Sequence, residues 1–200
     1  MFLISEMQSS FFLLSPAAAA FFSSMLFLGD TESAAAVILA SAVHEASHLI
    51  MLVVYDYRIA SIEMNMNGLC IKYAGKEDMT SKFLSNISGP LGGVLFYILE
   101  KLPGAAAFPQ WLILSCRVSL FLSLFNLMPV FPLDGGYCAY VILGLLVGFD
   151  ISEKIIKALG ALFSVMIITV GLAFIANDLG IGAMTAGMWL LCANISCNDL

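Results

Sequence analysis

The sequence contains two histidines, His44 and His48, and Glu45 lies between them in the order H-E-x-x-H. Four residues make about one turn of an α-helix, so both imidazoles project from one helix face and can bind one zinc ion. The alternative is a pair of histidines that share hydrogen bonds where two helices meet. That alternative leaves Glu45 as an ionisable group in an apolar helix without a purpose, which is costly. We therefore expect a metal site, with Glu45 offset along the helix so that it can meet the metal's water.

A catalytic zinc takes three protein ligands and leaves one position for water, so His44 and His48 need a third partner. Three side chains in apolar surroundings are candidates, namely Asp134, Cys138 and Cys116. The five cysteines of the chain show no C-x-x-C spacing, and we interpret them mainly as small apolar side chains. All three stay open as the third ligand, with Asp134 named first.

Asp134 lies in the segment 126–136, which reads N-L-M-P-V-F-P-L-D-G-G. Its two prolines lack the N–H that a helix requires, and its two glycines loosen the chain, so the segment predicts a break in a helix. Irregular backbone within a membrane is tolerated only where it is buried in protein or lines a wet cavity. An aspartate at such a break is well placed to reach a metal. The alternative is a loop at the cytoplasmic edge with a solvated Asp134.

The composition indicates a membrane protein. Of 200 residues, 61% are hydrophobic and 11% are charged, whereas soluble domains have roughly 45–50% apolar and about 25% charged residues. A spanning helix takes about 20 residues, so six crossings with short loops would fill the chain. The 8 basic residues form no run, which excludes nucleic acid as a partner.

Apolar runs bounded by charges, glycine or proline predict where the membrane spans lie. The predicted spans are at about 11–28, 34–54, 82–100, 110–128 with a continuation to about 149, 155–176 and 181–196. With six spans, both termini share the side that carries most of the lysine and arginine residues. The positive-inside rule then places both termini in the cytoplasm.

The long loop 55–81 contains a predicted β-hairpin at about 59–74, because apolar and polar residues alternate on both sides of Asn67-Gly68. One interpretation is an amphipathic hairpin at the membrane interface. The other is that the hairpin and the glycine-rich stretch 88–93 hold an extended substrate by strand addition. The candidate substrate-binding residues are Asn65, Asn67, Gly89 and Pro90.

Three further polar residues within the predicted spans have more ordinary interpretations. Arg117 is expected to extend to the lipid surface or to pair with a carboxylate or a lipid phosphate. Asn86 and Ser88 are expected to form hydrogen bonds between helices.

The two motifs together, H-E-A-S-H at 44–48 and N-L-M-P-V-F-P-L-D-G-G at 126–136, resemble those of the site-2 protease family of intramembrane zinc metalloproteases. The resemblance covers about residues 34–149, and the chain looks most like the compact branch that includes sporulation proteases. One departure is Gly93, which stands where family members often carry the asparagine of a G-P-x-x-N motif.

The resemblance implies a single membrane domain over 1–200 with a catalytic core at about 34–149 and no PDZ or CBS domain. The fold would be an all-α polytopic membrane protein with about six transmembrane helices, a three-helix core, a broken fourth helix and a small interfacial β-hairpin. His44, His48 and Asp134 would bind one zinc ion per chain, Glu45 would be the catalytic base, and Asn126 would position substrate or stabilise the oxyanion.

The implied function is zinc-dependent hydrolysis of peptide bonds in or near transmembrane segments of membrane-associated regulatory proteins. The enzyme would lie in the lipid bilayer of a bacterial cytoplasmic membrane, with a regulatory membrane protein as a further partner. Two alternatives remain open: a zinc transporter or sensor that uses the same ligands, and a non-catalytic membrane scaffold. Replacement of Glu45 by glutamine separates the three, because only a protease depends on that carboxylate.

Overall fold

The computed structural model describes residues 13–14, 31–55, 58–65, 68–74, 79–174 and 178–196. Within these ranges the chain is mainly helical. The helices are α2 (Thr31–Val54), α3 (Met79–Ile98), α4 (Gln110–Asn126), α5 (Asp134–Val147), α6 (Phe149–Ala173) and α7 (Asp178–Ser196), with short 3-10 turns η1 (Leu99–Lys101) and η2 (Ala105–Ala107) before α4.

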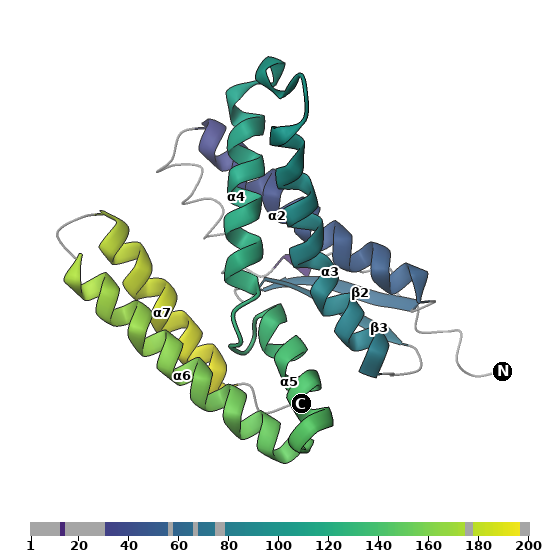
Figure 1. Cartoon of the computed structure of the whole chain (residues 1–200), viewed down its shortest axis with the longest axis vertical. Helices are drawn as coiled ribbons and strands as arrows, with labels where there is room; N and C mark the ends of the chain where they lie inside the picture. Colours follow the sequence, from purple (N-terminus) through teal and green to yellow (C-terminus); the bar gives the residue numbers. More distant parts are fainter. Residues whose placement is uncertain are drawn as a thin grey trace.

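Helices α2, α3 and α4 pack against one another and form the predicted three-helix core, and α5 packs against α3 (Figure 1). Helices α6 and α7 lie side by side, and α5 connects this pair to the rest of the molecule. The predicted fourth span is broken as expected, because α4 ends at Asn126 and α5 begins at Asp134. The chain thus changes direction immediately before the candidate ligand.

Three strands form a small sheet in the order β1 (Leu13–Leu14), β2 (Arg58–Asn65) and β3 (Gly68–Ala74). Strands β2 and β3 pair antiparallel where the alternation predicts a hairpin, and β1 pairs parallel to β2. The predicted span 11–28 lies outside the described residues except for Leu13–Leu14, which are extended rather than helical. The position of the hairpin at a membrane interface stays a prediction.

The helices bury small and polar side chains and expose large apolar ones. Five serines are at most 1% exposed, namely Ser115, Ser119, Ser123, Ser152 and Ser164. By contrast, Leu145 and Leu146 are 71% and 74% exposed. Water-soluble proteins bury their large apolar residues, whereas helices in lipid associate through small residues that let their backbones approach closely. The packing therefore has the polarity that lipid contact favours.

Two of the described helices, α2 and α6, are long and apolar enough to cross a bilayer. Shorter apolar helices are α4, α5 and the stretch Ile181–Ile195 of α7. Only 17% of the most apolar part of α2 and 22% of that of α6 is buried, which distinguishes both from the core helix of a soluble protein. The expectation of six complete crossings stays a prediction.

Arg117 of α4 pairs with a carboxylate, as one of the sequence interpretations expected. Its Nε and Nη2 atoms donate to Glu100 of η1, and the Nη2 to Oε1 distance is 2.9 Å. Lys101 lies 3.5 Å from the same carboxylate and also covers the ring of Tyr97. These contacts tie the end of α3 to the first half of α4.

The contact between α3 and α4 yields a test of this packing. Ser119 is 1% exposed, and its hydroxyl donates to the carbonyl of Gly93. We expect Ser119→Leu to destabilise the fold by about 1–3 kcal/mol, because the larger side chain overfills the contact. Equilibrium unfolding in detergent measures the effect, with Leu145→Ala on the exposed surface as the control. A greater loss of unfolding free energy in Leu145→Ala than in Ser119→Leu would contradict a packing that buries small residues and exposes large apolar ones.

Candidate metal centre

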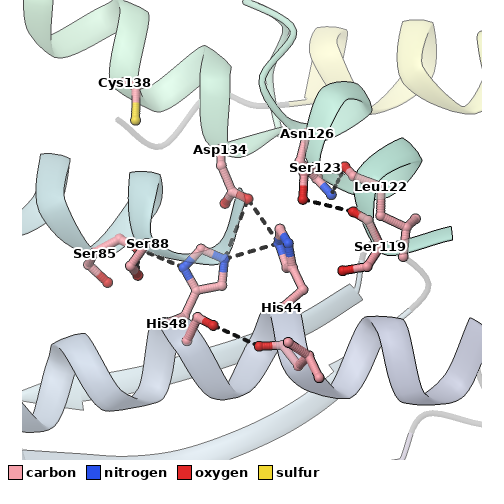
Figure 2. Close-up of polar contacts among 12 residues, drawn as sticks. His44, His48, Ser85, Ser88, Ser119, Leu122, Ser123, Asn126, Asp134 and Cys138 are labelled. Atoms are coloured by element: carbon pink, nitrogen blue, oxygen red, sulfur yellow. Dashed lines mark hydrogen bonds and ion pairs between the residues drawn. The ribbon is translucent and has the colours of Figure 1, made fainter. Parts of the chain in front are cut away.

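Two histidines of α2 and the first residue of α5 meet at one point (Figure 2). Asp134 Oδ2 lies 3.1 Å from His44 Nε2 and 3.4 Å from His48 Nε2. The two Nε2 atoms are 3.2 Å apart. Ninety residues of sequence separate His44 from Asp134, so tertiary packing creates this cluster.

The position of Asp134 depends on close packing between the first turn of α5 and the chain that precedes it. A Cβ atom on Gly135 would overlap the carbonyl of Leu127, and one on Gly136 would overlap the carbonyl of Val130. Our expectation that these glycines loosen the chain is therefore wrong, because both lie in α5 and allow a tight contact. At the start of α5, the Asp134 carboxylate also meets the positive end of the helix dipole.

Helix α3 orients His48. The Nδ1–H of His48 donates to the main-chain carbonyl of Ser85 at 2.7 Å, which leaves the Nε2 lone pair directed toward His44 and Asp134. The carbonyl of Ser85 also accepts a hydrogen bond from the hydroxyl of Ser88. Such a contact behind a ligating histidine fixes both its tautomer and the direction of its ring.

His44 is held mainly by packing, and only 6% of the residue is exposed. Its Nδ1 atom is buried and has no hydrogen-bond partner among the described residues. Its Nε2 atom faces Asp134 and is the nitrogen that can bind a metal.

The cluster fits a zinc ion. Zinc lies about 2.0–2.2 Å from histidine nitrogen and carboxylate oxygen, so tetrahedral ligands are about 3.3–3.6 Å apart. The three observed separations of 3.1, 3.2 and 3.4 Å are close to this spacing. Two imidazoles and one carboxylate also form a donor set typical of catalytic zinc sites. Of the candidates for the third ligand, Asp134 is the one in the cluster.

The two cysteine candidates lie elsewhere. The Cys138 thiol faces the carbonyl of Phe83 at 3.8 Å, and Cys116 is buried within α4. Neither belongs to the group of His44, His48 and Asp134.

A cavity of about 370 Å³ adjoins the three candidate ligands and Glu45. Its apolar side is formed by large residues of α2, α4 and α7 and of the segment before α5, namely Leu52, Leu122, Phe125, Trp189, Pro132 and Leu133. Ser85, Asn86 and Asn126 contribute further polar groups. The arrangement places a carboxylate that can carry a proton beside a potential metal, in a space large enough for several water molecules or a short peptide segment.

Asn126 lies at the last residue of α4 and lines this cavity. One N–H of its carboxamide donates to the carbonyl of Leu122 in its own helix at 3.0 Å. Among the described residues, the second N–H and the oxygen of this carboxamide make no hydrogen bond, so both can serve an oxyanion or substrate contact.

The four candidate substrate-binding residues are placed differently. Gly89 lies against the ring of His48, so a Cβ atom there would overlap the imidazole. Pro90 is fully buried. Asn65 ends β2 and pairs with Gly68, and Asn67 lies outside the described residues. The structure thus brings Gly89 to the back of the metal centre.

Sequence reasoning missed three contributions to the site, from the carbonyl of Ser85, the side chain of Asn86 and Trp189 of α7. The expectation that Asn86 and Ser88 bond between helices is wrong, because both donate to carbonyls of α3 itself. Pro90 is a sequence signal for an irregular turn of α3 near Ser85 and Asn86, because it removes the helical donor of the Asn86 carbonyl, but it does not identify these contributions.

No family model matches the chain, and neither does any curated protein. The structure is similar to that of the site-2 protease from Methanocaldococcus jannaschii, with a TM-score of 0.69 and 19% sequence identity. The similarity covers 91% of this chain and 86% of that chain. At this identity the similarity establishes a shared fold, so the predicted resemblance to site-2 proteases is confirmed at the level of the fold.

Asp134→Asn tests the third ligand. We expect zinc content to fall at least about tenfold at limiting zinc, because the amide replaces an anionic ligand with a neutral one. Metal analysis of the purified protein measures the effect, with Cys138→Ser one turn further along α5 as the control. Unchanged zinc content in Asp134→Asn would contradict the assignment.

Gly89→Ala tests how α3 supports His48. The added methyl group would displace the imidazole, so we expect weaker zinc binding although no ligand has changed. Gly182→Ala is the matched control, because a Cβ atom on that helical glycine meets no other atom. Equal zinc affinity in the two variants would show that the His48 ring tolerates displacement.

Proposed function

We propose that this chain, which has the fold of a site-2 protease, is an intramembrane zinc metalloprotease. Its substrates would be membrane-associated regulatory proteins, cleaved in or near a transmembrane segment. The observation that carries the proposal is the convergence of His44, His48 and Asp134 on one point, with Glu45 lining the same cavity. The apolar outer surface of the surrounding helices supports a location within lipid.

The residues of the cavity can divide the work of peptide hydrolysis among them. A zinc ion held by His44, His48 and Asp134 would act as a Lewis acid and lower the pKa of water from about 15.7 toward 7. Glu45 accepts the proton of the attacking water and passes it to the leaving amine. The free N–H of Asn126 is a donor for the negative charge that develops on the carbonyl oxygen.

A transmembrane substrate must unwind before its main chain can reach these groups, because helical amides are already hydrogen-bonded. We propose that the unwound segment adds to the sheet, where it exchanges helical hydrogen bonds for strand bonds. The described sheet supports this arrangement, because β3 is an edge strand with one side unpaired. In this view Asn65 and Asn67 would lie near the substrate, whereas Gly89 and Pro90 would support the site from behind.

The proposed setting follows from the sequence and the fold together. The chain would form one membrane domain over 1–200, with the catalytic core at about 34–149, six crossings and both termini in the cytoplasm. Besides the substrate and the bilayer, a regulatory membrane protein is a proposed partner.

Glu45→Gln tests the proposal. We expect the variant to bind zinc as the wild type does and to lose proteolysis at least about 100-fold, because a general base contributes about 10²–10⁴ in rate. Fluorescein-labelled casein in detergent micelles is the probe, and release of labelled fragments is the measurement. Removal of zinc by a chelator should also stop cleavage, and added zinc should restore it.

The same variant separates the alternatives. A zinc transporter or sensor would keep most of its function in Glu45→Gln, and a scaffold would keep all of it. Equal cleavage of casein by the wild type and the variant would refute the protease proposal.

A further inference from the structure

Pro90 interrupts the hydrogen-bond ladder of α3 next to the metal centre. A proline has no N–H, so the carbonyl four residues earlier loses its helical donor. That carbonyl belongs to Asn86, a residue that lines the cavity. The carbonyl of the preceding residue, Ser85, already accepts from His48. This turn of α3 therefore carries one carbonyl that orients His48 and one that has lost its helical donor.

The side chain of Asn86 is arranged like that of Asn126 on the neighbouring helix. Asn86 donates one N–H to the carbonyl of Lys82 at 2.9 Å, and Asn126 donates one to Leu122 at 3.0 Å. In both cases the carboxamide is fixed to the residue four positions earlier in its own helix. Each side chain is partly buried and retains a second N–H and its oxygen for other partners.

We propose that Asn86 is a substrate-binding residue that acts together with Asn126 to hold the main chain of an extended peptide in the cavity. The proposal rests on the proposed protease function. A carboxamide offers the same donor and acceptor pair as a peptide group. Two of them, one on α3 and one on α4, can therefore pair with the N–H and C=O groups of the substrate.

The chemistry of the cavity explains why such groups are needed. An unwound peptide brings main-chain donors and acceptors out of water, and each group left unpaired is costly. Most of the remaining lining is apolar or consists of the candidate ligands and Glu45. Asn86 and Asn126 are the two carboxamides among the residues that line the cavity. They recognise the peptide main chain, which favours a substrate class defined by local unwinding rather than by one side chain.

The first test is Asn86→Ala in the zinc-loaded full-length protein, with fluorescein-labelled casein as the probe. We expect KM to rise about threefold to tenfold, because a neutral hydrogen bond of this kind is lost. We also expect kcat to stay within about twofold, because the contact is made equally in the ground state and the transition state. Zinc content should not change.

Two further variants control for effects on the helix. Thr169→Ala removes a side-chain bond to the residue four positions earlier in α6, away from the cavity, and should leave KM unchanged. Asn86→Leu keeps the branched shape and the number of heavy atoms of the side chain without its polar groups, and it should reproduce the increase in KM even if the alanine variant folds poorly. Asn86→Gln restores a carboxamide and should recover part of the affinity.

A binding measurement separates this inference from the proposed function. In the Glu45→Gln background, fluorescence anisotropy of labelled casein should show weaker binding when Asn86→Ala is added. Unchanged KM and unchanged binding in an enzyme that cleaves casein would overturn the role of Asn86 alone. Equal cleavage of casein by the wild type and by Glu45→Gln would instead refute the protease proposal.

Discussion

The convergence of one carboxylate oxygen on two imidazole nitrogens is the interaction on which the rest of the structure depends. His44 and His48 are neighbours on α2 by helical spacing alone, but Asp134 reaches them only because α4 ends at Asn126 and a new helix begins at Asp134. If one continuous helix ran through this segment, its rise and rotation would carry the Asp134 carboxylate away from the two histidines. The break therefore creates the site, and the close contacts of Gly135 and Gly136 keep it in one position.

Small residues let the helices around the site pack closely against one another. Gly89 contacts the His48 ring, Gly92 contacts Ser47 of α2, and Gly93 contacts Ser119 and Ser123 of α4. Helix α3 is thus the central element, since its glycine-rich stretch meets α2 through Gly89 and Gly92 and α4 through Gly93. In lipid, where the hydrophobic effect does not drive helices together, such close backbone approach provides the packing energy. The same packing leaves the large apolar residues on the outside.

Much of this arrangement could be predicted from sequence because it depends on local spacing. The H-E-x-x-H motif predicts that both histidines and Glu45 lie at one site, and the prolines of 126–136 predict the helix break beside Asp134. The roles of Gly89 and Asn86 could not be predicted in this way. Gly89 was expected to contact a substrate, yet it lies against His48, and only the packing of α3 on α2 reveals that contact. Periodicity identifies the face of a helix, but not which helix will cover it.

Pro90 lies in the part of α3 that packs against the candidate metal centre. In a helix without proline, each main-chain carbonyl of α3 would accept a hydrogen bond from the N–H four residues later. The proline removes one donor, and the carbonyl of Ser85 beside the interruption orients His48. The next residue, Asn86, lines the cavity. In an apolar environment an irregular helix can thus orient a ligand with a neutral main-chain group, without a further charge.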